Sequence, residues 1–474
     1  MDSVIFGADI TTLLDLTPRD FQDNHYTPLE AQTTWWLPTP DRKIHPFSLS
    51  IQQFPFRGPT SFGQRFTFDV PSTGCGDILL STILQIELGH WFDDTTICRF
   101  QTGQYVYKPG ETIWNYSNSL GTVIVEKAEF EVNGVTIESI SGDFINIHSL
   151  LAYDIQSQYG IATDGLGRKL FPYTPLQNSP FPTESGSLCI PLSFFYQRIL
   201  LKEGFPLLAT KPGSVKIHIT LRPFEQCIVC SLPAITPLDV PIQILDTGVE
   251  KTIHTLKTVP SFKKIQLVTY AAHMNGSIRN AILHSPFETM TRIVETFSFL
   301  EPLRYSINTS SEDIINIQLP IEINHPMEEI WWVLRRKAST LKNDYINYSA
   351  ITESEYNPLF NQKKPLLVKA GIYLNGTEII QKEEEWFRQH ISKLHKGGIS
   401  AFSQYIYGYS FARTPGVHQP SGTANASKLQ SVKLALTVQQ PGGLENKEWE
   451  VLVYVVRLEW LRFQNGMMNR IYMD

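Results

Sequence analysis

The chain carries little charge for its length. Asp, Glu, Lys and Arg make up 18% of the 474 residues, below the roughly 25% that is usual in soluble domains. The net charge of −6 supplies no basic face for nucleic acid. We therefore expect no direct nucleic-acid binding, and we expect partner subunits to cover much of the uncharged surface. The nearest approach to a basic patch, Arg335-Arg336-Lys337, is interpreted as a solvated strand end.

Cysteine is also scarce, and the number is odd, which fits a reducing compartment rather than a disulfide framework. Two of the residues form a single CxxC without a second pair or a nearby His pair, so it is a weak signal for zinc or redox chemistry. We interpret it as two sulfurs at the end of an apolar strand. The five residues are Cys75, Cys98, Cys189, Cys227 and Cys230.

Long apolar runs are missing. No window approaches 18 apolar residues, so no segment is expected to span a bilayer. The N-terminus lacks the Lys/Arg-led apolar core of a signal peptide, which predicts a soluble protein made in the cytosol. Residues 1–24 are predicted to form an N-terminal arm, with Phe6, Ile10, Leu13 and Leu14 at helical spacing. Packing on its own domain and docking on a neighbour or an inner layer remain equally open for this arm.

Catalytic signatures are missing as well. The sequence has no GxSxG, HExxH, P-loop or GxGxxG string. His390 and His395 are five apart, which does not place them on one helix face for metal ligation, and Glu383-Glu384-Glu385 is typical of a solvated helix start. We expect no catalytic, cofactor-binding or metal-binding residues, and hence no enzyme. Glycosylation is left open at six Asn-x-Ser/Thr triplets, which begin at Asn115, Asn275, Asn308, Asn347, Asn375 and Asn425.

The most informative feature that is present is an internal duplication. Residues 127–148 align without a gap to residues 369–390. Each copy reads as a strand, an Asn-Gly turn and a returning strand, and Asn-Gly supplies the two positive-φ positions of a type I′ hairpin. The turns are Asn133-Gly134 and Asn375-Gly376; they are followed by Asp143-Phe144 and His148 in the first copy and by Glu385-Trp386 and His390 in the second.

A second matching pair follows in the same order. Residues 215–221 (VKIHITL) mirror residues 432–438 (VKLALTV). The sequence therefore predicts two copies of one β-rich module. We expect the first over residues 25–230, a proline-punctuated connector over 231–262, and the second over 263–474.

Short strand-like runs dominate both copies. Many alternate with period two, which predicts antiparallel sandwiches of the jelly-roll kind. Residues 449–460 are apolar on both faces, so this strand is expected to be buried on both sides. Helical patterning is rare and is clearest over 383–396, with 144–154 in the matching place of the first copy. The expected strands are 65–70, 78–88, 123–132, 215–221, 265–271, 314–323, 329–334, 369–374, 432–438 and 449–460.

Four strings follow one another in the C-terminal third: GGISA (397–401), YGYSFA (407–412), QPSGTANAS (419–427) and WLRFQNGM (460–467). In sequence and order they resemble the major capsid proteins of nucleocytoplasmic large DNA viruses, and QPSGTANAS is the most specific of them. The resemblance is clearest over 265–474 and weaker in the first half, where it includes IPLSFF (190–195). Length and style suggest the marseillevirus branch.

This resemblance implies an all-β fold of two tandem eight-stranded antiparallel jelly-roll sandwiches with short helices in loops. It further implies homotrimers whose six sandwiches form a pseudo-hexagonal capsomer, tiling an icosahedral shell over an inner membrane together with minor capsid and penton proteins. No catalytic residues are carried over. Pro420-Ser421-Gly422 is interpreted as a turn into the strand at 428–438, and Arg462 and Asn465 as polar anchors.

The duplication gives this implication a physical reason. Three single modules would form three lobes, whereas three duplicated chains form six nearly equal lobes that can tile a surface. Two alternatives stay open: a transient viral scaffold of the same fold, and a carbohydrate-binding or carbohydrate-cleaving tandem sandwich. The last would use Trp35-Trp36 or Trp114 as a platform.

Overall fold

Alternating apolar residues build the first β-sandwich. The strand β2 (Arg65–Val70) buries Phe66, Phe68 and Val70 and exposes the residues between them. The strand β10 (Val215–Leu221) repeats that alternation, as period two requires of strands with one face on a core. The computed structural model describes residues 47–71, 74–89, 97–101, 104–106, 113–154, 157, 160, 165–168, 186–198, 203–231, 253–256, 261–274, 276–301, 313–341, 343–350, 365–395, 397, 405–440 and 448–471.

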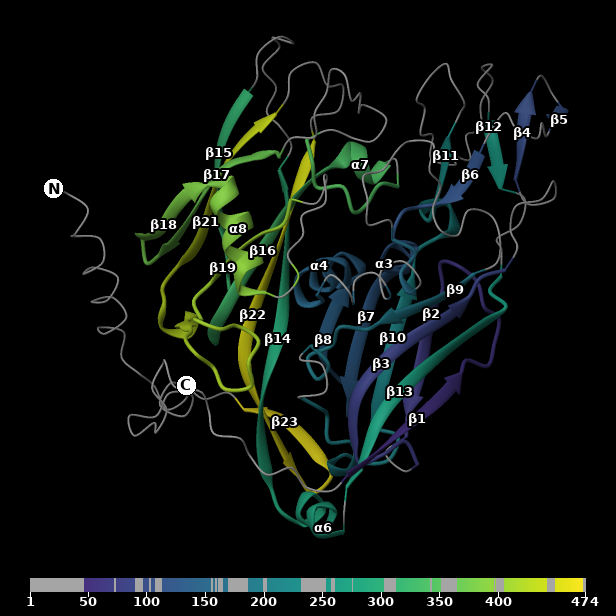
Figure 1. Cartoon of the computed structure of the whole chain (residues 1–474), viewed down its shortest axis with the longest axis vertical. Helices are drawn as coiled ribbons and strands as arrows, with labels where there is room; N and C mark the ends of the chain where they lie inside the picture. Colours follow the sequence, from purple (N-terminus) through teal and green to yellow (C-terminus); the bar gives the residue numbers. More distant parts are fainter. Residues whose placement is uncertain are drawn as a thin grey trace.

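The first sandwich consists of two antiparallel four-stranded sheets (Figure 1). One has the order β1 (Phe47–Pro55), β13 (Lys264–Met274), β3 (Ile78–Glu87) and β9 (Ser187–Pro191). The other has the order β2, β10, β7 (Val125–Val132) and β8 (Val135–Ser141). Small sheets in its loops are β12 (Ile253–Leu256), β4 (Ile97–Gln101) and β5 (Gln104–Val106), and β11 (Ile228–Ser231) with β6 (Ile113–Tyr116). Its helices are α3 (Leu120–Val123), α4 (Gly142–Ala152), η2 (Leu207–Ala209) and η3 (Phe224–Gln226).

The second sandwich repeats this plan. One sheet follows the order β14 (Phe287–Glu301), β22 (Trp449–Gln464), β16 (Pro326–Arg336) and β19 (Tyr407–Ser410), with β20 (Ala424–Asn425) beside β16 and β23 (Met467–Ile471) beside β22. The other has the order β15 (Asp313–Pro320), β21 (Val432–Gln440), β17 (Leu367–Leu374) and β18 (Thr377–Glu383). The helices here are α6 (Gly276–His284), α7 (Lys337–Leu341), α8 (Glu384–Leu394) and η5 (Ala426–Lys428).

The two copies agree in detail. In both hairpins the turn residues adopt positive φ, 53° and 81° at Asn133-Gly134 and 51° and 82° at Asn375-Gly376. Both hairpins have a bulge at the same place, after Phe130 and after Ile372. The helices α4 and α8 each span 11 residues and begin at equivalent positions of the alignment. The predicted duplication and the tandem jelly-roll fold are confirmed.

One predicted boundary is corrected by the duplication itself. The second unit was expected to start at residue 263, yet β13 pairs with β1 and β3 of the first sandwich. The strand β13 holds the place in its sheet that β22 holds in the other, so it is the last strand of the first copy. The connector likewise contains β12, which pairs with β4. Local pattern reveals a strand but not its partner, because pairing joins residues about 200 positions apart in the sequence.

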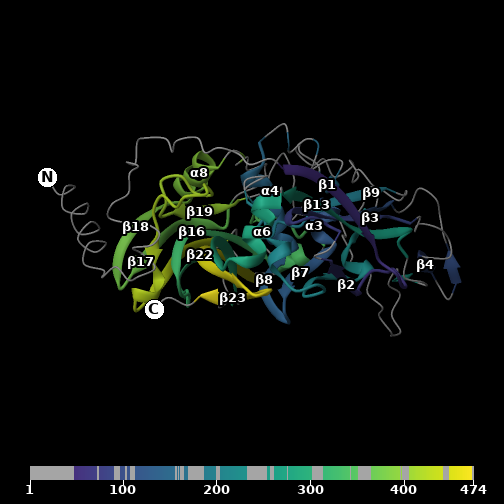
Figure 2. The same cartoon turned by 90° about the horizontal axis from the view of Figure 1, so that it is seen from below.

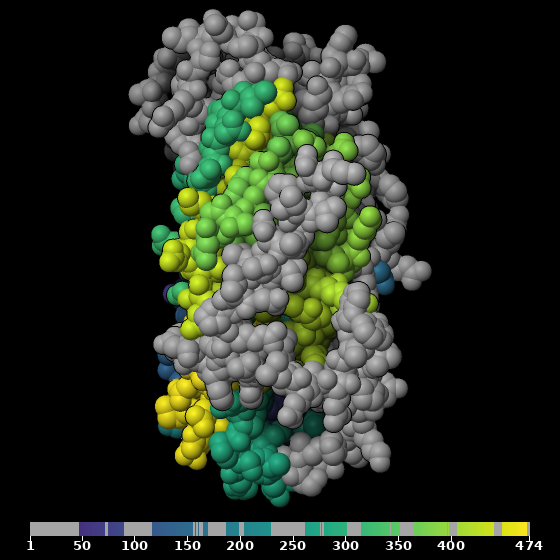
Figure 3. Space-filling view, turned by 90° about the vertical axis from the view of Figure 1, so that its left-hand side faces the viewer, coloured from purple at the N-terminus to yellow at the C-terminus, as the bar shows by residue number. Residues whose placement is uncertain are grey.

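The strand β22 is buried on both faces, as its sequence predicts. Val451, Val453 and Val455 point into the core of the second sandwich, and Leu452, Tyr454 and Val456 join the core of the first. This strand therefore forms a wall shared by both halves, which lie side by side in Figure 2. The space-filling view in Figure 3 shows the opposite, outward side of the second sandwich, where β15, β17 and β21 form a tall face.

Two further expectations concern the N-terminal arm and membrane-spanning segments. The N-terminal arm at 1–24 falls outside the described residues. None of the helices in the ranges given above is both long and apolar enough to cross a bilayer.

Candidate functional site

The seam between the two sandwiches is the most elaborate site in the described chain. The helix α4 and the strand β8 of the first sandwich pack on the outer face of the sheet containing β14, β22 and β16. Phe144 of α4 stacks on Trp331 with ring centroids 6.0 Å apart and planes 10° apart, and it lies 5.6 Å from Tyr454. All three rings are buried, so burial of large aromatic surface joins the halves.

Local capping sets the position of α4. Ser141 accepts a hydrogen bond at Oγ from the backbone N–H of Phe144, 3.2 Å away, which satisfies an N-terminal donor of the helix. Phe144 and His148 then fall one turn apart on the same helix face. The acidic-aromatic pair found in the sequence thus places its aromatic member in the seam and its acidic member at the helix start.

An ion-pair network closes the upper part of the seam. Asp143 pairs at Oδ1 with Arg335 Nη1 of β16 at 2.7 Å, and Arg335 Nη2 pairs with Glu450 at 2.6 Å. Burial alone lowers the pKa of Arg335, but the two carboxylates outweigh it and raise the pKa overall. Arg336 is fully buried and donates to the carbonyl oxygen of Ala350.

The interpretation of Arg335-Arg336-Lys337 as a solvated strand end is therefore wrong for its first two residues. Only Lys337 lies at the surface, paired with Glu448 at 2.7 Å. The error has a physical cause: a guanidinium is tolerated inside when carboxylates and carbonyls satisfy its donors, and those acceptors come from distant segments.

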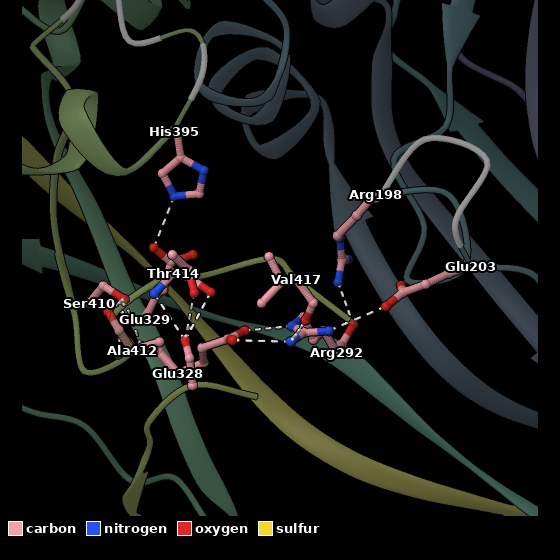
Figure 4. Close-up of polar contacts among 11 residues, drawn as sticks. Arg198, Glu203, Arg292, Glu328, Glu329, His395, Ser410, Ala412, Thr414 and Val417 are labelled. Atoms are coloured by element: carbon pink, nitrogen blue, oxygen red, sulfur yellow. Dashed lines mark hydrogen bonds and ion pairs between the residues drawn. The ribbon is translucent and has the colours of Figure 1, made fainter. Parts of the chain in front are cut away.

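A second network lies lower in the seam (Figure 4). Arg292 of β14 forms a bidentate pair with Glu328 of β16, at 2.6 Å from Nε and 3.1 Å from Nη2. The same guanidinium contacts Glu203 of the first sandwich at 3.2 Å. Arg198, also from the first sandwich, pairs with Glu138 and donates to the carbonyl oxygen of Arg292 at 2.6 Å.

Burial shifts the pKa of the carboxyls in this network. Desolvation raises the pKa of Glu203 and of Glu328, and Arg292 only partly offsets the rise. Nearby, desolvation lowers the pKa of His395 but Glu329, bonded at 2.9 Å, raises it more, so the net shift is upward. The pKa of each of these groups is therefore set by the balance between its burial and its charged partners.

His148 behaves differently from His395. Burial, followed by the charges of Arg198 and His395, lowers the pKa of His148 to about 3. Its ring therefore sits in the seam as a neutral group beside Phe144, at 5.8 Å between ring centroids. Its protonation would place an uncompensated charge in the seam.

Other candidate residues from the sequence lie apart from one another. Cys227 is buried, and across the described residues no cluster of three or more His, Cys, Asp or Glu side chains is placed to hold a metal ion. Glu384 is buried and pairs with Arg388 at 3.2 Å, whereas Glu383 and Glu385 are exposed. The expected anchor Arg462 is half-exposed near Glu288, and Asn465 has a φ of 54° in the β22–β23 turn.

Sequence reasoning missed the Arg292–Glu328–Glu203 network entirely. Glu203 lies in a loop, Arg292 in β14 and Glu328 in β16, and no local spacing in the sequence connects them. The turn between β22 and β23 could have been predicted, because Asn465-Gly466 is the same dipeptide that forms the turns of the duplicated hairpins.

Family models match most of the chain in two consecutive pieces. The model for the "Major capsid protein N-terminus" matches residues 41–259, and the model for the "Large eukaryotic DNA virus major capsid protein" matches residues 293–469. A major capsid protein of Phaeocystis pouchetii virus is 21% identical, covering 97% of this chain and 99% of that protein. Capsid protein 1 of Acanthamoeba polyphaga mimivirus is 25% identical over 38% of this chain and 29% of that protein.

Solved structures agree in fold. A chain of the PBCV-1 virus capsid superposes with a TM-score of 0.63 at 16% identity, covering 93% of this chain and all of that one. The Faustovirus major capsid protein superposes with a TM-score of 0.62 at 12% identity, covering 97% and 98%. Because two consecutive models of major capsid proteins together match residues 41–259 and 293–469, the chain belongs to the major capsid proteins of large eukaryotic DNA viruses.

Proposed function

We propose that the protein is a virion shell subunit that associates as a homotrimer, so that six sandwiches form a pseudo-hexagonal capsomer. One observation carries the proposal: the two halves share strand order, helix position, hairpin turns and hairpin bulges. Three copies of a chain with two near-equivalent lobes have six lobes, and a six-lobed unit can tile a surface that a three-lobed unit cannot.

The buried seam supports this function. A lobe arrangement that defines a hexagonal tile has to be fixed, and the seam holds it with aromatic stacking and with paired buried charges. Breaking such a pair exposes an uncompensated charge to a low-dielectric interior. The two sandwiches of one chain therefore behave as one rigid third of the capsomer.

The proposal also covers the assembled shell, its other components and the site of synthesis. Capsomers are inferred to tile an icosahedral shell that faces an inner viral membrane, with minor capsid and penton proteins as further partners and host cytoplasm as the site of synthesis. The net charge of −6 fits a shell that does not bind the genome directly. Membership of the marseillevirus branch stays a prediction.

The test is the mass of the purified protein in solution. Native mass spectrometry and sedimentation at micromolar concentration are expected to give three times the 54.0 kDa chain mass. A stable monomer or dimer would refute the trimer. High copy number in purified virions is expected of a shell subunit, whereas a transient scaffold would be absent from them.

A further inference from the structure

The contact between the two sandwiches of one chain suggests how neighbouring chains contact each other. In it, a helix from the hairpin sheet of one sandwich packs on the outer face of the other sheet of the next sandwich. We propose that α8 of one subunit docks in the same way on the outer face of the sheet β1-β13-β3-β9 of the neighbouring subunit. This inference rests on the proposed trimer and adds the surfaces that form it.

The helix α8 is the duplicate of α4. The gap-free alignment places Trp386 where α4 has Phe144, and His390 where α4 has His148. Trp386 stacks on His390 with ring centroids 4.6 Å apart and planes 11° apart. Unlike its fully buried counterpart Phe144, Trp386 is only partly buried, against the core of the second sandwich. The aromatic residue that joins the sandwiches in the seam therefore has a counterpart on α8 that is still partly accessible to solvent.

The receiving sheet is also duplicated. β1, β13, β3 and β9 stand in the order of β14, β22, β16 and β19. On β14, Val294 lies opposite the seam residue Val456 and is only 5% exposed. On β1, by contrast, the outward residues are open to solvent: Phe47, Leu49 and Ile51 are 51%, 55% and 55% exposed.

This apolar stripe continues onto the neighbouring strand β13. Antiparallel partners share a face, and Ile51 lies opposite Tyr270 while Phe47 lies opposite Met274. Ser50, between the exposed residues, instead points to the sandwich and donates to the carbonyl oxygen of Cys75. An exposed, apolar edge strand favours association with another chain.

The two surfaces lie on the same side of the molecule. In Figure 2 both α8 and β1 lie along its upper edge, with α4 between them. A head-to-tail contact that joins unlike surfaces closes into a ring when its rotation divides the circle. The in-chain seam and the proposed contact would then alternate around the six lobes.

The new contact is expected to be more apolar than the seam. Glu138, which binds Arg198 in the seam, is replaced at the equivalent position by Ile380. Ile380, like Trp386, is partly buried against the core of the second sandwich. The charged pair is absent on this side, and the ring of Trp386 is larger than that of Phe144. Both differences favour an interface that forms by burial of apolar surface.

Site-directed photocrosslinking tests the proposal in the intact chain. A benzoyl-phenylalanine is introduced in place of Gln389, an exposed residue of α8, and isotope-labelled and unlabelled chains are mixed to identify inter-chain products. Crosslinks to peptides containing residues 47–55 or 264–274 of the other chain are expected. The same probe at Ile314 of β15, 61% exposed on the other sheet, should not reach them.

A pair of substitutions gives an independent readout. Leu49→Asp places a charge in the proposed contact and should weaken trimer association on the order of a hundredfold, whereas the matched change Ile314→Asp should leave it unaltered. Circular dichroism verifies that both variants fold. An intact trimer that crosslinks from Gln389 to other surfaces, including residues 1–46, overturns the contact but keeps the proposed function. Wild-type protein without any trimer overturns both.

Discussion

Replacing Arg292 should destabilise the contact between the two sandwiches. Its guanidinium is the cation shared by Glu328 and Glu203, whose side chains are 0% and 9% exposed. Arg292→Met keeps an apolar chain of similar length but leaves both carboxylates without this partner. Loss of one member of a buried pair costs about 3–5 kcal/mol, which corresponds to a lowering of Tm by about 6–20 °C for a domain of this size.

The pH dependence of this loss has a definite sign. Desolvation already raises the pKa of Glu203 and Glu328, and removal of the cation raises it further. A carboxyl with a raised folded pKa favours the folded state below its unfolded pKa and loses that contribution as pH rises through the folded pKa. The variant should therefore lose more stability at pH 8 than at pH 5.

The effect is measured by thermal and urea unfolding of three proteins: wild type, Arg292→Met and the double variant Arg292→Met/Glu328→Gln. Neutralising Glu328 should restore part of the loss, because one buried charge is then gone. A Tm within 2 °C of wild type, or a double variant no more stable than the single one, would refute the role assigned to this network.

Three further predictions concern the seam and the duplication. The pKa of His148 is lowered to about 3, so protonation of the unfolded chain should cost wild type about 2 kcal/mol between pH 7 and pH 5; His148→Asn should lack this loss in pH-dependent urea unfolding. Phe144→Ala should destabilise by about 3–5 kcal/mol, measured by calorimetry, and an effect below 1 kcal/mol would contradict its central place in the seam. Gly134→Val and Gly376→Val, at φ values of 81° and 82°, should each cost about 1–3 kcal/mol, and clearly unequal losses by urea unfolding would argue against equivalent turns.

The repeated hairpins show how much of this fold local sequence specifies. Asn-Gly dictates a tight turn through its positive-φ residues, so both hairpins follow from the residues alone. The two-sided apolar pattern of 449–460 likewise predicts a strand buried on both faces, as found in β22. These features depend on neighbours along the chain.

Features that depend on distant partners could not be predicted. The assignment of β13 to the first sandwich depends on hydrogen bonds to β1 and β3, and the burial of Arg335 depends on Asp143, 192 residues away in the sequence. An isolated pattern of Arg residues indicates solvent exposure because buried guanidinium groups need acceptors. The acceptors become apparent only when the two sandwiches are placed together.

Cryo-microscopy of the purified assembly tests the central claim most directly. The duplication predicts three chains around one axis, six sandwiches alternating between the two halves, and α8 of each chain seated on the β1-β13-β3-β9 sheet of the next. A particle with another number of chains, or one in which the two halves do not occupy alternating, near-equivalent positions, would contradict it.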